Sequence, residues 1–181
     1  YKNGTSIQTG TSSANPIQRS LQSRLDDFVN VRSFGANGDG TDQTLALQRA
    51  IDQLYLPWSG ASDADSLKKR VTLKLDAGLY KINDSLKVPP YVNLVGDGSD
   101  KTVIEQTGAF AVIETINGNG INAQTSSTNQ SNIIRLQGMT LKSYLTNPAL
   151  KLSSTKDSQF VDIKLQGPWT QGSAINATQV G

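Results

Sequence analysis

The sequence has no cysteine and no histidine. Without cysteine the chain has no disulfide framework and no thiolate metal site, and without histidine it lacks the commonest metal ligand and the usual general base. Long apolar runs are also missing, since no stretch approaches the roughly 18 residues that span a membrane. No secretory signal is visible after Tyr1, and a chain that begins with tyrosine is expected to be processed or trimmed. These absences exclude a disulfide scaffold, histidine-based catalysis and membrane insertion.

Charge is scarce and balanced. Charged residues make up 18% of the chain and the formal net charge is +2, which favours neither a basic surface for nucleic acid nor an acidic tail. The hydrophobic fraction of 36% is low, whereas serine, threonine, asparagine and glutamine are abundant. A chain of 181 residues is long enough for one core. This balance favours an elongated β protein with much surface per residue.

A glycine-rich turn organises the N-terminal half of the chain. Gly35, Gly38 and Gly40 lie within six positions and predict a tight turn with positive φ angles, after a short strand at residues 28–34. As a phosphate cradle this run lacks the lysine and the spacing of nucleotide-binding loops. As a calcium loop it lacks further ligands at fixed steps after Asp39. We therefore interpret the glycines as a structural turn and expect no metal and no cofactor.

The turn leads into a predicted helix over residues 42–56. Thr41 and Asp42 stand where a helix N-cap is required, because their side-chain oxygens accept the free N–H groups of a first turn. Apolar residues recur at helical spacing on one face, at Leu47, Ala50, Ile51 and Leu54. A segment further along the chain must cover this face.

The residues before the turn are polar at first and then amphipathic. Residues 1–15 lack periodicity and predict an extended arm, which either is free or drapes over a partner subunit. Asn15 and Pro16 begin a short amphipathic helix that runs to Phe28. This helix packs on the body of the same chain or joins an oligomeric bundle, and both alternatives stay open.

After a polar loop the pattern changes to short strands. At residues 71–75 apolar residues alternate with Thr72 and Lys74, as in a strand with one buried face. No later helix has a convincing pattern. Further short strands are predicted at residues 79–82, 85–88, 91–95 and 102–106.

The last third of the chain repeats itself at an offset of 24 residues. This offset pairs Met139 with Ile163 and Leu141 with Leu165. A period in the low twenties, made of short alternating strands, predicts a solenoid. Since one coil cannot bury its apolar face alone, neighbouring coils must stack.

Two finer expectations follow from the repeat. Residues 149–152 map at about the same offset onto residues 173–176. Strict alternation also predicts that three apolar side chains point the same way, away from Asp162, Lys164 and Gln166: these are Val161, Ile163 and Leu165.

Three motifs resemble the pectate-lyase-like right-handed β-helix superfamily. Residues 31–52 look like its entry motif, and residues 75–82 and 92–98 resemble the next two signatures in the same order. The leader at residues 21–30 is similar to bacteriophage tailspike and tail-fibre proteins. The resemblance covers about residues 28–181. It implies an all-β fold, a single-stranded right-handed parallel β-helix, with the helix after the glycine turn as its N-terminal cap.

The chain departs from the family pattern in two places. Gln43 stands where the family usually has a second acid, and the loop there is one residue shorter, which concerns how the helix is capped. A β-helix that ended at Gly181 would expose a strand edge and a bare apolar core. We therefore expect a longer parent protein, or partners that cover this end.

Because the superfamily contains polysaccharide lyases and hydrolases, the resemblance directs attention to carboxylates. Glycoside hydrolysis needs two of them within about 5–10 Å. Of the 15 acidic residues, only Asp157 and Asp162 fall in the coils after residue 115, while Glu105 and Glu114 lie on or near earlier strands. These four are the candidate catalytic residues. The alternative is that they are solvated charges on outer faces.

Exposed aromatic rings can stack on sugars. Tyr144 and Trp169 are the candidate substrate-binding residues, with Tyr91 as a further one. Aromatic residues make up only 6% of the chain and do not cluster in the sequence. Packing in the core or in loops is the alternative interpretation.

Residues 1–27 are assigned to attachment and oligomerisation, and residues 28–181 to a capped β-helix that continues beyond its C-terminal end. The resemblance implies a structural component of a bacteriophage tail, in a tailspike, tail fibre or baseplate appendage. This virion-proximal β-helix, usually homotrimeric, would link the particle to a distal region that binds host surface glycan. Its other partners would be tail or baseplate proteins, and it would be assembled in the cytoplasm of the bacterial host.

Two enzymatic alternatives stay open. The first is a polysaccharide depolymerase, a lyase or glycoside hydrolase that acts on host capsule or lipopolysaccharide and whose groove is completed beyond Gly181. The second is a cellular pectinolytic enzyme, which would have a signal peptide upstream of Tyr1. We expect no catalysis by residues 1–181 alone.

Overall fold

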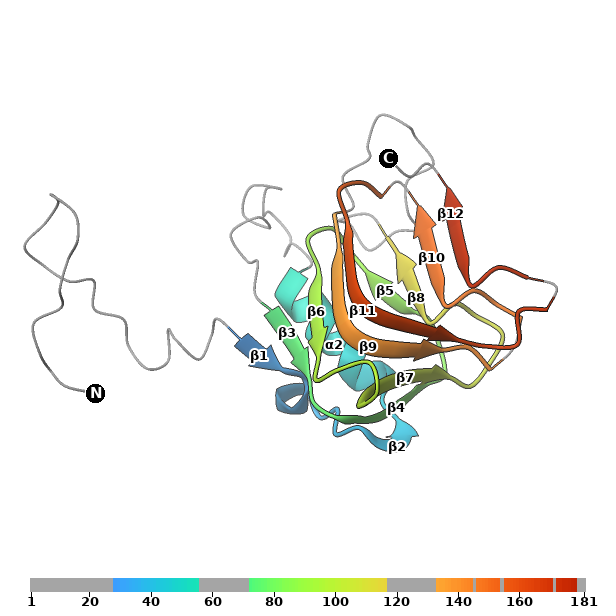
Figure 1. The fold of residues 1–181 in the computed structure, drawn as a ribbon. Helices are drawn as coiled ribbons and strands as arrows, with labels where there is room; N and C mark the ends of the chain where they lie inside the picture. The colour runs from blue at the N-terminus through green and yellow to red at the C-terminus, as the bar shows by residue number, and fades with distance from the viewer. Residues whose placement is uncertain are drawn as a thin grey trace, which may run out of the picture.

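The computed structural model describes residues 28–55, 72–116, 133–144, 146–153, 155–170 and 172–178 (Figure 1). The predicted arm, the helix predicted from Pro16 and the polar segment 117–132 lie outside these residues. In chain order the elements are β1 (Phe28–Asn30), the 3-10 helix η1 (Val31–Phe34), β2 (Asp39–Asp42), α2 (Thr44–Tyr55), β3 (Thr72–Leu75), β4 (Gly78–Ile82), β5 (Leu86–Val88), β6 (Asn93–Gly96), β7 (Thr102–Gln106), β8 (Ile113–Thr115), β9 (Arg135–Lys142), β10 (Leu150–Ser153), β11 (Gln159–Gln166) and β12 (Ile175–Thr178).

The strands form parallel sheets that stack coil upon coil. One sheet has the order β1-β3-β6-β9-β7-β4-β2, with β11 paired to β9, and the other has the order β12-β10-β8-β5. The long strand β9 pairs with β6 over residues 135–137 and with β7 over residues 140–142, so it joins two arms of one bent sheet. Successive coils are therefore β3-β4-β5, β6-β7-β8, β9-β10 and β11-β12, which Figure 1 shows from green to red. This is the predicted right-handed parallel β-helix.

Gly138 and Asp162 bend the long strands β9 and β11. Both have a left-handed backbone, with φ of 64° at Gly138 and 49° at Asp162. A Cβ at Gly138 would lie 2.9 Å from the carbonyl oxygen of Gly96, in the coil below. Glycine therefore suits the point where the third coil turns closely over the second.

The bend at Asp162 shows that the predicted direction of the Val161 side chain was wrong. Val161 pairs with Gln137 on the outer face and is 44% exposed, whereas Phe160 pairs with the buried Leu136. Val161 therefore does not point the same way as Ile163. The physical reason is that the left-handed residue between them resets the two-residue alternation of a regular strand.

The pairing of the last coils confirms part of the predicted repeat. Met139 pairs with Ile163 and Leu141 with Leu165, at the predicted offset of 24. The mapping of residues 149–152 was wrong by one position, since Leu150 pairs with Ile175. The segment before β12, residues 167–174, is one residue longer than the segment before β10, residues 143–149.

The other predicted strands differ mainly at their ends. The strand predicted at residues 28–34 stops at Asn30, whose side chain accepts the N–H of Arg32 and begins the 3-10 helix η1. The strands at 102–106 and 71–75 are observed as β7 and, from Thr72, as β3. Strands β2 and β8 were not predicted: β2 lies in the glycine-rich segment that was assigned to a turn, and β8 is a strand of three residues.

Helix α2 begins at Thr44 and ends at Tyr55, inside the predicted range. Leu47, Ala50 and Ile51 are at most 2% exposed, and Leu54 packs half-buried against the same core. The helix thus buries the predicted apolar face, and Tyr55 extends it.

Gln48 of α2 binds the main chain of strand β5. Its Nε2 donates to the carbonyl oxygen of Lys87 (3.0 Å), and its Oε1 accepts the N–H of Lys87 (2.9 Å). One amide side chain thus makes both hydrogen bonds that a neighbouring strand would make with this residue. This contact agrees with the predicted cap, and how much of the end of the stack α2 covers stays a prediction.

Candidate functional site

A groove of about 630 Å³ runs over the outer face of β1, β3, β6 and the first half of β9. We call this surface the groove face. The register of the parallel strands builds it from two columns of outward side chains. The first column is Phe28, Thr72, Asn93 and Arg135, and the second includes Lys74, Val95 and Gln137.

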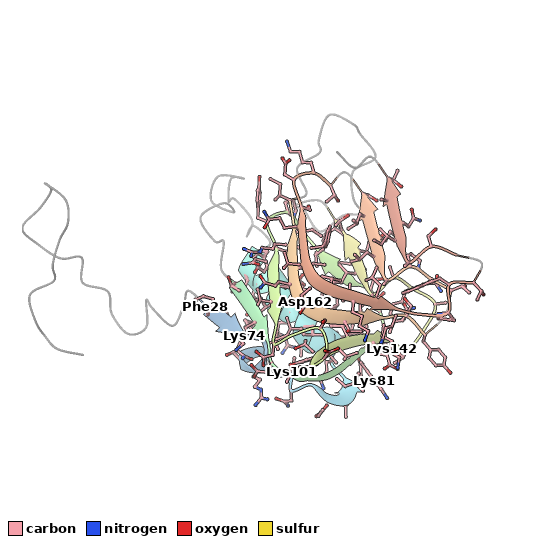
Figure 2. The ribbon with its side chains drawn as sticks, in the orientation of Figure 1. Phe28, Lys74, Lys81, Lys101, Lys142 and Asp162 are labelled. Atoms are coloured by element: carbon pink, nitrogen blue, oxygen red, sulfur yellow. The ribbon has the colours of Figure 1, made fainter. Side chains whose placement is uncertain are left out.

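The stacking of coils makes this site a linear array. Neighbouring parallel strands lie about 4.8 Å apart, so each coil places its outward side chains one step further along the groove. Figure 2 shows Phe28 and Lys74 close together on the β1 and β3 side of the molecule. The geometry suits an extended ligand that lies along the axis of the stack.

Hydrogen bonds fix the polar side chains of the groove. The Nδ2 of Asn93 donates to the Oγ1 of Thr72 (2.8 Å). The Nζ of Lys74 lies 3.2 Å from the Oδ1 of Asp97, and Asp97 also accepts the N–H of Ala77 (3.0 Å). Lys74 first, and the Ala77 N–H second, hold the pKa of Asp97 below its usual value. Asp97 is therefore an ionised partner for Lys74 near neutral pH.

Arg135 has a different environment. Its Nη2 donates to the Oε1 of Gln137 (3.1 Å), and no described carboxylate lies within ion-pair distance of it. A guanidinium presents five N–H donors in a planar fork, so one bond to a neutral amide leaves donors for a ligand. The groove thus carries an exposed cation that no acid of the described chain neutralises.

The groove does not contain a pair of carboxylates. Asp97 is the one acidic side chain among its lining residues, and it is bound to Lys74. General acid and base catalysis of glycoside hydrolysis needs a second carboxylate across the bound sugar. As far as the described residues go, the groove can bind a ligand but lacks the pair that would cleave it by this mechanism.

The predicted catalytic carboxylates Glu105 and Glu114 lie on other faces. The Oε2 of Glu105 on β7 lies 3.0 Å from the Nζ of Lys142, and the Oε1 of Glu114 on β8 lies 2.6 Å from the Nζ of Lys151. Both acids are largely buried beside these lysines, with 15% and 17% of their side chains exposed. Because β7 and β8 belong to different sheets, the two carboxylates face different sides of the coil.

Glu105 belongs to a column in which the sign of the charge alternates from coil to coil. The register aligns Asp42 of β2, Lys81 of β4, Glu105 of β7 and Lys142 of β9. We call this outer surface of β4, β7 and the second half of β9 the ladder face. Figure 2 shows Lys81 and Lys142 there, on the far side of the bend from Lys74. Opposite charges on adjacent strands stabilise a sheet, which gives Glu105 a structural role.

Asp157 and Asp162 have different surroundings. Asp162 accepts hydrogen bonds from the N–H (3.1 Å) and the Oγ (2.6 Å) of Ser99, which hold the pKa of its carboxyl below the usual value. Asp157 is exposed in a turn and has a φ of 47°. Among the described residues none of the four candidates is hydrogen-bonded to another, and their catalytic role stays a prediction.

The candidate aromatic residues lie in loops outside the groove. Tyr144 is 64% exposed after β9. Trp169 is half-buried against the core, and its Nε1 donates to the carbonyl oxygen of Asn147 (2.9 Å). Tyr91, in the turn between β5 and β6, has a φ of 69°, and its N–H donates to the carbonyl oxygen of Ile133 (2.7 Å). They do not form a common surface with the groove.

The glycine turn has the geometry of a fixed structural corner. Gly35, Gly38 and Gly40 all have positive φ angles, at 94°, 65° and 81°. Asp42 accepts the N–H (3.0 Å) and the Oγ1 (2.5 Å) of Thr44 at the start of α2. Among the described residues, no three acidic side chains gather where they would hold a metal ion.

Gln43 explains the departure from the family pattern. Its Oε1 accepts the N–H of Asn37 (3.0 Å), and its Nε2 donates to the Oδ1 of Asp39 (2.9 Å) and the Oγ1 of Thr41 (2.7 Å). An ionised carboxylate can only accept, so an acid at this position would lose the last two bonds. The amide therefore joins both sides of the turn.

Sequence reasoning did not single out the residues of the groove. Asn93 aligns with Arg135 across 42 residues, including the long segment 117–132. The 24-residue repeat of the last coils does not reveal this offset. The missing signal was the register of β6 with β9.

Known proteins resemble this chain in sequence and in fold. Residues 28–180 match the family model described as Rhamnogalacturonase A/epimerase, pectate lyase-like. A glucan 1,3-beta-glucosidase of Cochliobolus carbonum is 30% identical over an alignment of 94 residues, which covers 48% of this chain and 10% of that protein.

Two solved structures share the β-helix fold. ORF18 of Geobacillus virus E2 superposes with a TM-score of 0.59 and 22% identity, over 79% of this chain and 27% of that one. An iota-carrageenase complexed with iota-carrageenan fragments gives a TM-score of 0.52 and 16% identity, over 93% of this chain and 35% of that one.

The length of these relatives differs from that of the present chain, which spans between 10% and 35% of each. Neither described helix is long and apolar enough to cross a membrane.

Although the chain spans only part of each relative, the family model covers the described chain from β1 to β12. The chain belongs to the Rhamnogalacturonase A/epimerase, pectate lyase-like family.

Proposed function

We propose that this chain is the virion-proximal β-helix of a bacteriophage tail appendage, and that it links the particle to a distal region that binds host glycan. The observation that carries the proposal is the pairing of the candidate carboxylates. Glu105 is bound to Lys142 and Glu114 to Lys151, so both acids hold coils together. The likeness to ORF18 of Geobacillus virus E2 supports a viral source.

The proposal includes the assembly of the appendage. Residues 1–27 attach the chain to other tail or baseplate proteins, and three copies form the shaft of a tailspike or fibre in the virion. Light scattering on the parent protein tests the trimer. Deletion of residues 1–27 is expected to abolish incorporation into particles, and unchanged incorporation would contradict the role of this segment.

The second candidate is a polysaccharide depolymerase. The likeness to iota-carrageenase and the family match favour it, because the names of these relatives describe enzymes that act on polysaccharides. In this case the catalytic carboxylates lie beyond residue 181 of a longer parent.

Turnover separates the two candidates. Residues 1–181 and the full-length parent are incubated with host surface polysaccharide, and new reducing ends and unsaturated sugars are measured. We expect no product from residues 1–181, because three of their four candidate acids, Glu105, Glu114 and Asp162, are engaged with a lysine or with Ser99. Product from residues 1–181, lost in Glu105→Gln or Glu114→Gln, would overturn the structural role. Product from the full-length parent alone would make the parent a depolymerase.

A further inference from the structure

We infer that the interior of the β-helix holds a buried water molecule that bridges the side chains of Gln106 and Ser143. This site lies inside the coils, where strands β7 and β9 end, and is separate from the outer faces. It goes beyond the proposed function, which concerns attachment and linkage, and it does not require that the chain belongs to a virion. It rests on three unpartnered polar atoms, on their register and on the walls around them.

The unpartnered atoms belong to two buried side chains. Gln106 is fully buried, and Ser143 is 2% exposed. The Nε2 and Oε1 of Gln106 and the Oγ of Ser143 have no hydrogen-bond partner among the described residues. A buried amide or hydroxyl without a partner is costly, and native interiors supply such groups with protein atoms or ordered water. These three atoms therefore need a partner that the described side chains do not provide.

The strand register brings the two side chains together. Strands β7 and β9 pair as far as Glu105 and Lys142, so Gln106 and Ser143 follow at the next matching position (Figure 1). Because side chains alternate along a strand, the outward Glu105 and Lys142 are followed by two residues that point into the core. Neighbouring strands lie about 4.8 Å apart. A small molecule between the two polar ends can therefore bond to both.

The walls of the site are apolar. Ile82 of β4 pairs with Gln106 on one side and is fully buried. On the other side Gly167 lies close to Ser143, because a Cβ at Gly167 would lie 3.0 Å from the Cβ of Ser143 and 2.6 Å from the ring of Trp169. The indole N–H of Trp169 already donates to a main-chain carbonyl oxygen. These walls thus add no partner for the amide.

The polar atoms determine which ligand fits. An amide has two N–H donors and a carbonyl acceptor, and a hydroxyl both donates and accepts, so the ligand must do both as well. The charges beside the site belong to Glu105 and Lys142, which are bound to each other on the outer face. A metal ion would need several oxygen ligands. Water is a neutral donor and acceptor that protein interiors hold, typically with about 2–4 hydrogen bonds.

The coil before shows that the fold does not require an amide at this position. Ile82 stands one coil earlier in the same inward column and is an apolar residue. The polar pair is therefore a feature of the second and third coils alone. Since the pairing of β7 with β9 ends at Glu105 and Lys142, a bridging water joins the two strands beyond their last paired residues.

The first test observes the water directly. A high-resolution crystal structure of the whole chain should show an ordered water within about 2.7–3.2 Å of both the Gln106 amide and the Ser143 Oγ. In solution, NMR should show a rotating-frame Overhauser cross-peak between water and the side-chain NH2 of Gln106, because the two are in contact. A direct hydrogen bond between Gln106 and Ser143, a dry site, or an ion at this position would overturn the inference.

Variants test whether the water bridges the pair. Ser143→Ala removes one partner of the water and should raise the equilibrium constant of unfolding about fivefold. Gln106→Leu combined with Ser143→Ala removes all three polar atoms. This double variant should stay within about threefold of the native equilibrium constant, because no buried polar atom is then left without a partner. A double variant whose loss equals the sum of the losses in the two single variants would overturn the bridge.

Thr115→Val is the matched control. The Oγ1 of Thr115 accepts the N–H of Ser153 (2.8 Å) and donates to the carbonyl oxygen of Ser153 (3.2 Å), so both of its hydrogen bonds are to protein groups. Its loss should raise the equilibrium constant of unfolding and leave the water cross-peak of Gln106 unchanged. Loss of this cross-peak in Thr115→Val as well as in Ser143→Ala would contradict a water held by Ser143. None of these results depends on polysaccharide turnover, so the proposed function is tested separately.

Discussion

The groove face and the ladder face are built by the same backbone and differ in what their side chains do with charge. On the ladder face, Lys81, Glu105 and Lys142 follow one another across three coils, and each acid has a lysine beside it. On the groove face, the corresponding positions hold Thr72, Asn93 and Arg135, and the cation at the end has no acid opposite. The two faces meet at the bend through Gly138.

This difference concerns how stacked strands avoid like charges side by side. Parallel stacking puts like positions next to one another, so an uninterrupted column of equal charges would be destabilising. On the ladder face, alternating charges avoid this repulsion. On the groove face, neutral amides and hydroxyls avoid it. Arg135 thus has neutral neighbours in its column and one side-chain hydrogen bond, to the amide of Gln137.

The largest expected effect on the free energy of unfolding comes from a substitution in the core directly behind the groove face. Leu136 is fully buried in β9, in one inward column with Leu94 of β6. We expect Leu136→Ala to lower the free energy of unfolding by about 3 kcal/mol, because it leaves a cavity between coils. Val161→Ala, on the outer face of β11, is the control and should cost about 0.5 kcal/mol or less. Equal losses in urea denaturation would contradict the inward and outward assignment at this bend.

The next effect concerns the bend that divides the two faces. Gly138→Ala places a Cβ 2.9 Å from the carbonyl oxygen of Gly96 and forces alanine into a φ of 64°. We expect a loss of about 2 kcal/mol in thermal unfolding. At Gly35, with a φ of 94° and no atom within 4 Å of an added Cβ, alanine meets the backbone strain alone. A loss at Gly138 no larger than that at Gly35 would show that the coils do not approach so closely.

Sequence reasoning succeeded where the physics is local or repeats. The helix face at Leu47 and Ile51, the strand at 102–106 and the pairing of Met139 with Ile163 each follow from periodicity within a short window. The family motifs gave the β-helix fold itself. These features need no knowledge of distant pairing.

The failures come from single residues that shift the register. Asp162 reverses the inward direction for Val161, and one added residue before β12 moves the partner of Leu150 to Ile175. The groove was not predicted for a similar reason, because Asn93 and Arg135 pair across 42 residues that include the segment 117–132. For Glu105 and Glu114, the pattern placed both acids on or near strands but did not reveal the lysines that neutralise them.

A smaller effect compares the two faces by their ion pairs. A double-mutant cycle with Glu105→Gln and Lys142→Met should give a coupling energy of about 0.5–1 kcal/mol, because Lys142 is 43% exposed and water screens the pair. Arg135→Gln, on the groove face, should change the unfolding free energy by less than about 0.5 kcal/mol. A larger loss of unfolding free energy in Arg135→Gln than in Glu105→Gln would show that Arg135 stabilises the fold.

The smallest effect is a pH dependence at the bend. Ser99 donates two hydrogen bonds to Asp162, which lower the pKa of this carboxyl from its ordinary 3.8. The charged form is therefore favoured by folding, and its contribution is present above about pH 4 and lost as the pH falls through the lower folded pKa. In Asp162→Asn, the free energy of unfolding should fall less steeply as the pH is lowered. Asp157→Asn, at a second acid with positive φ, is the control, and equal changes in slope would contradict the role of Ser99.

The most direct test of the difference between the faces is the salt dependence of urea unfolding in Glu105→Gln and Arg135→Gln. Salt screens the attraction between Glu105 and Lys142, so the loss of unfolding free energy in Glu105→Gln should shrink as salt is raised. The effect of Arg135→Gln should stay the same at low and high salt, because Arg135 has no ion pair among the described residues. Equal salt dependence in the two variants, or a larger one in Arg135→Gln, would contradict the account.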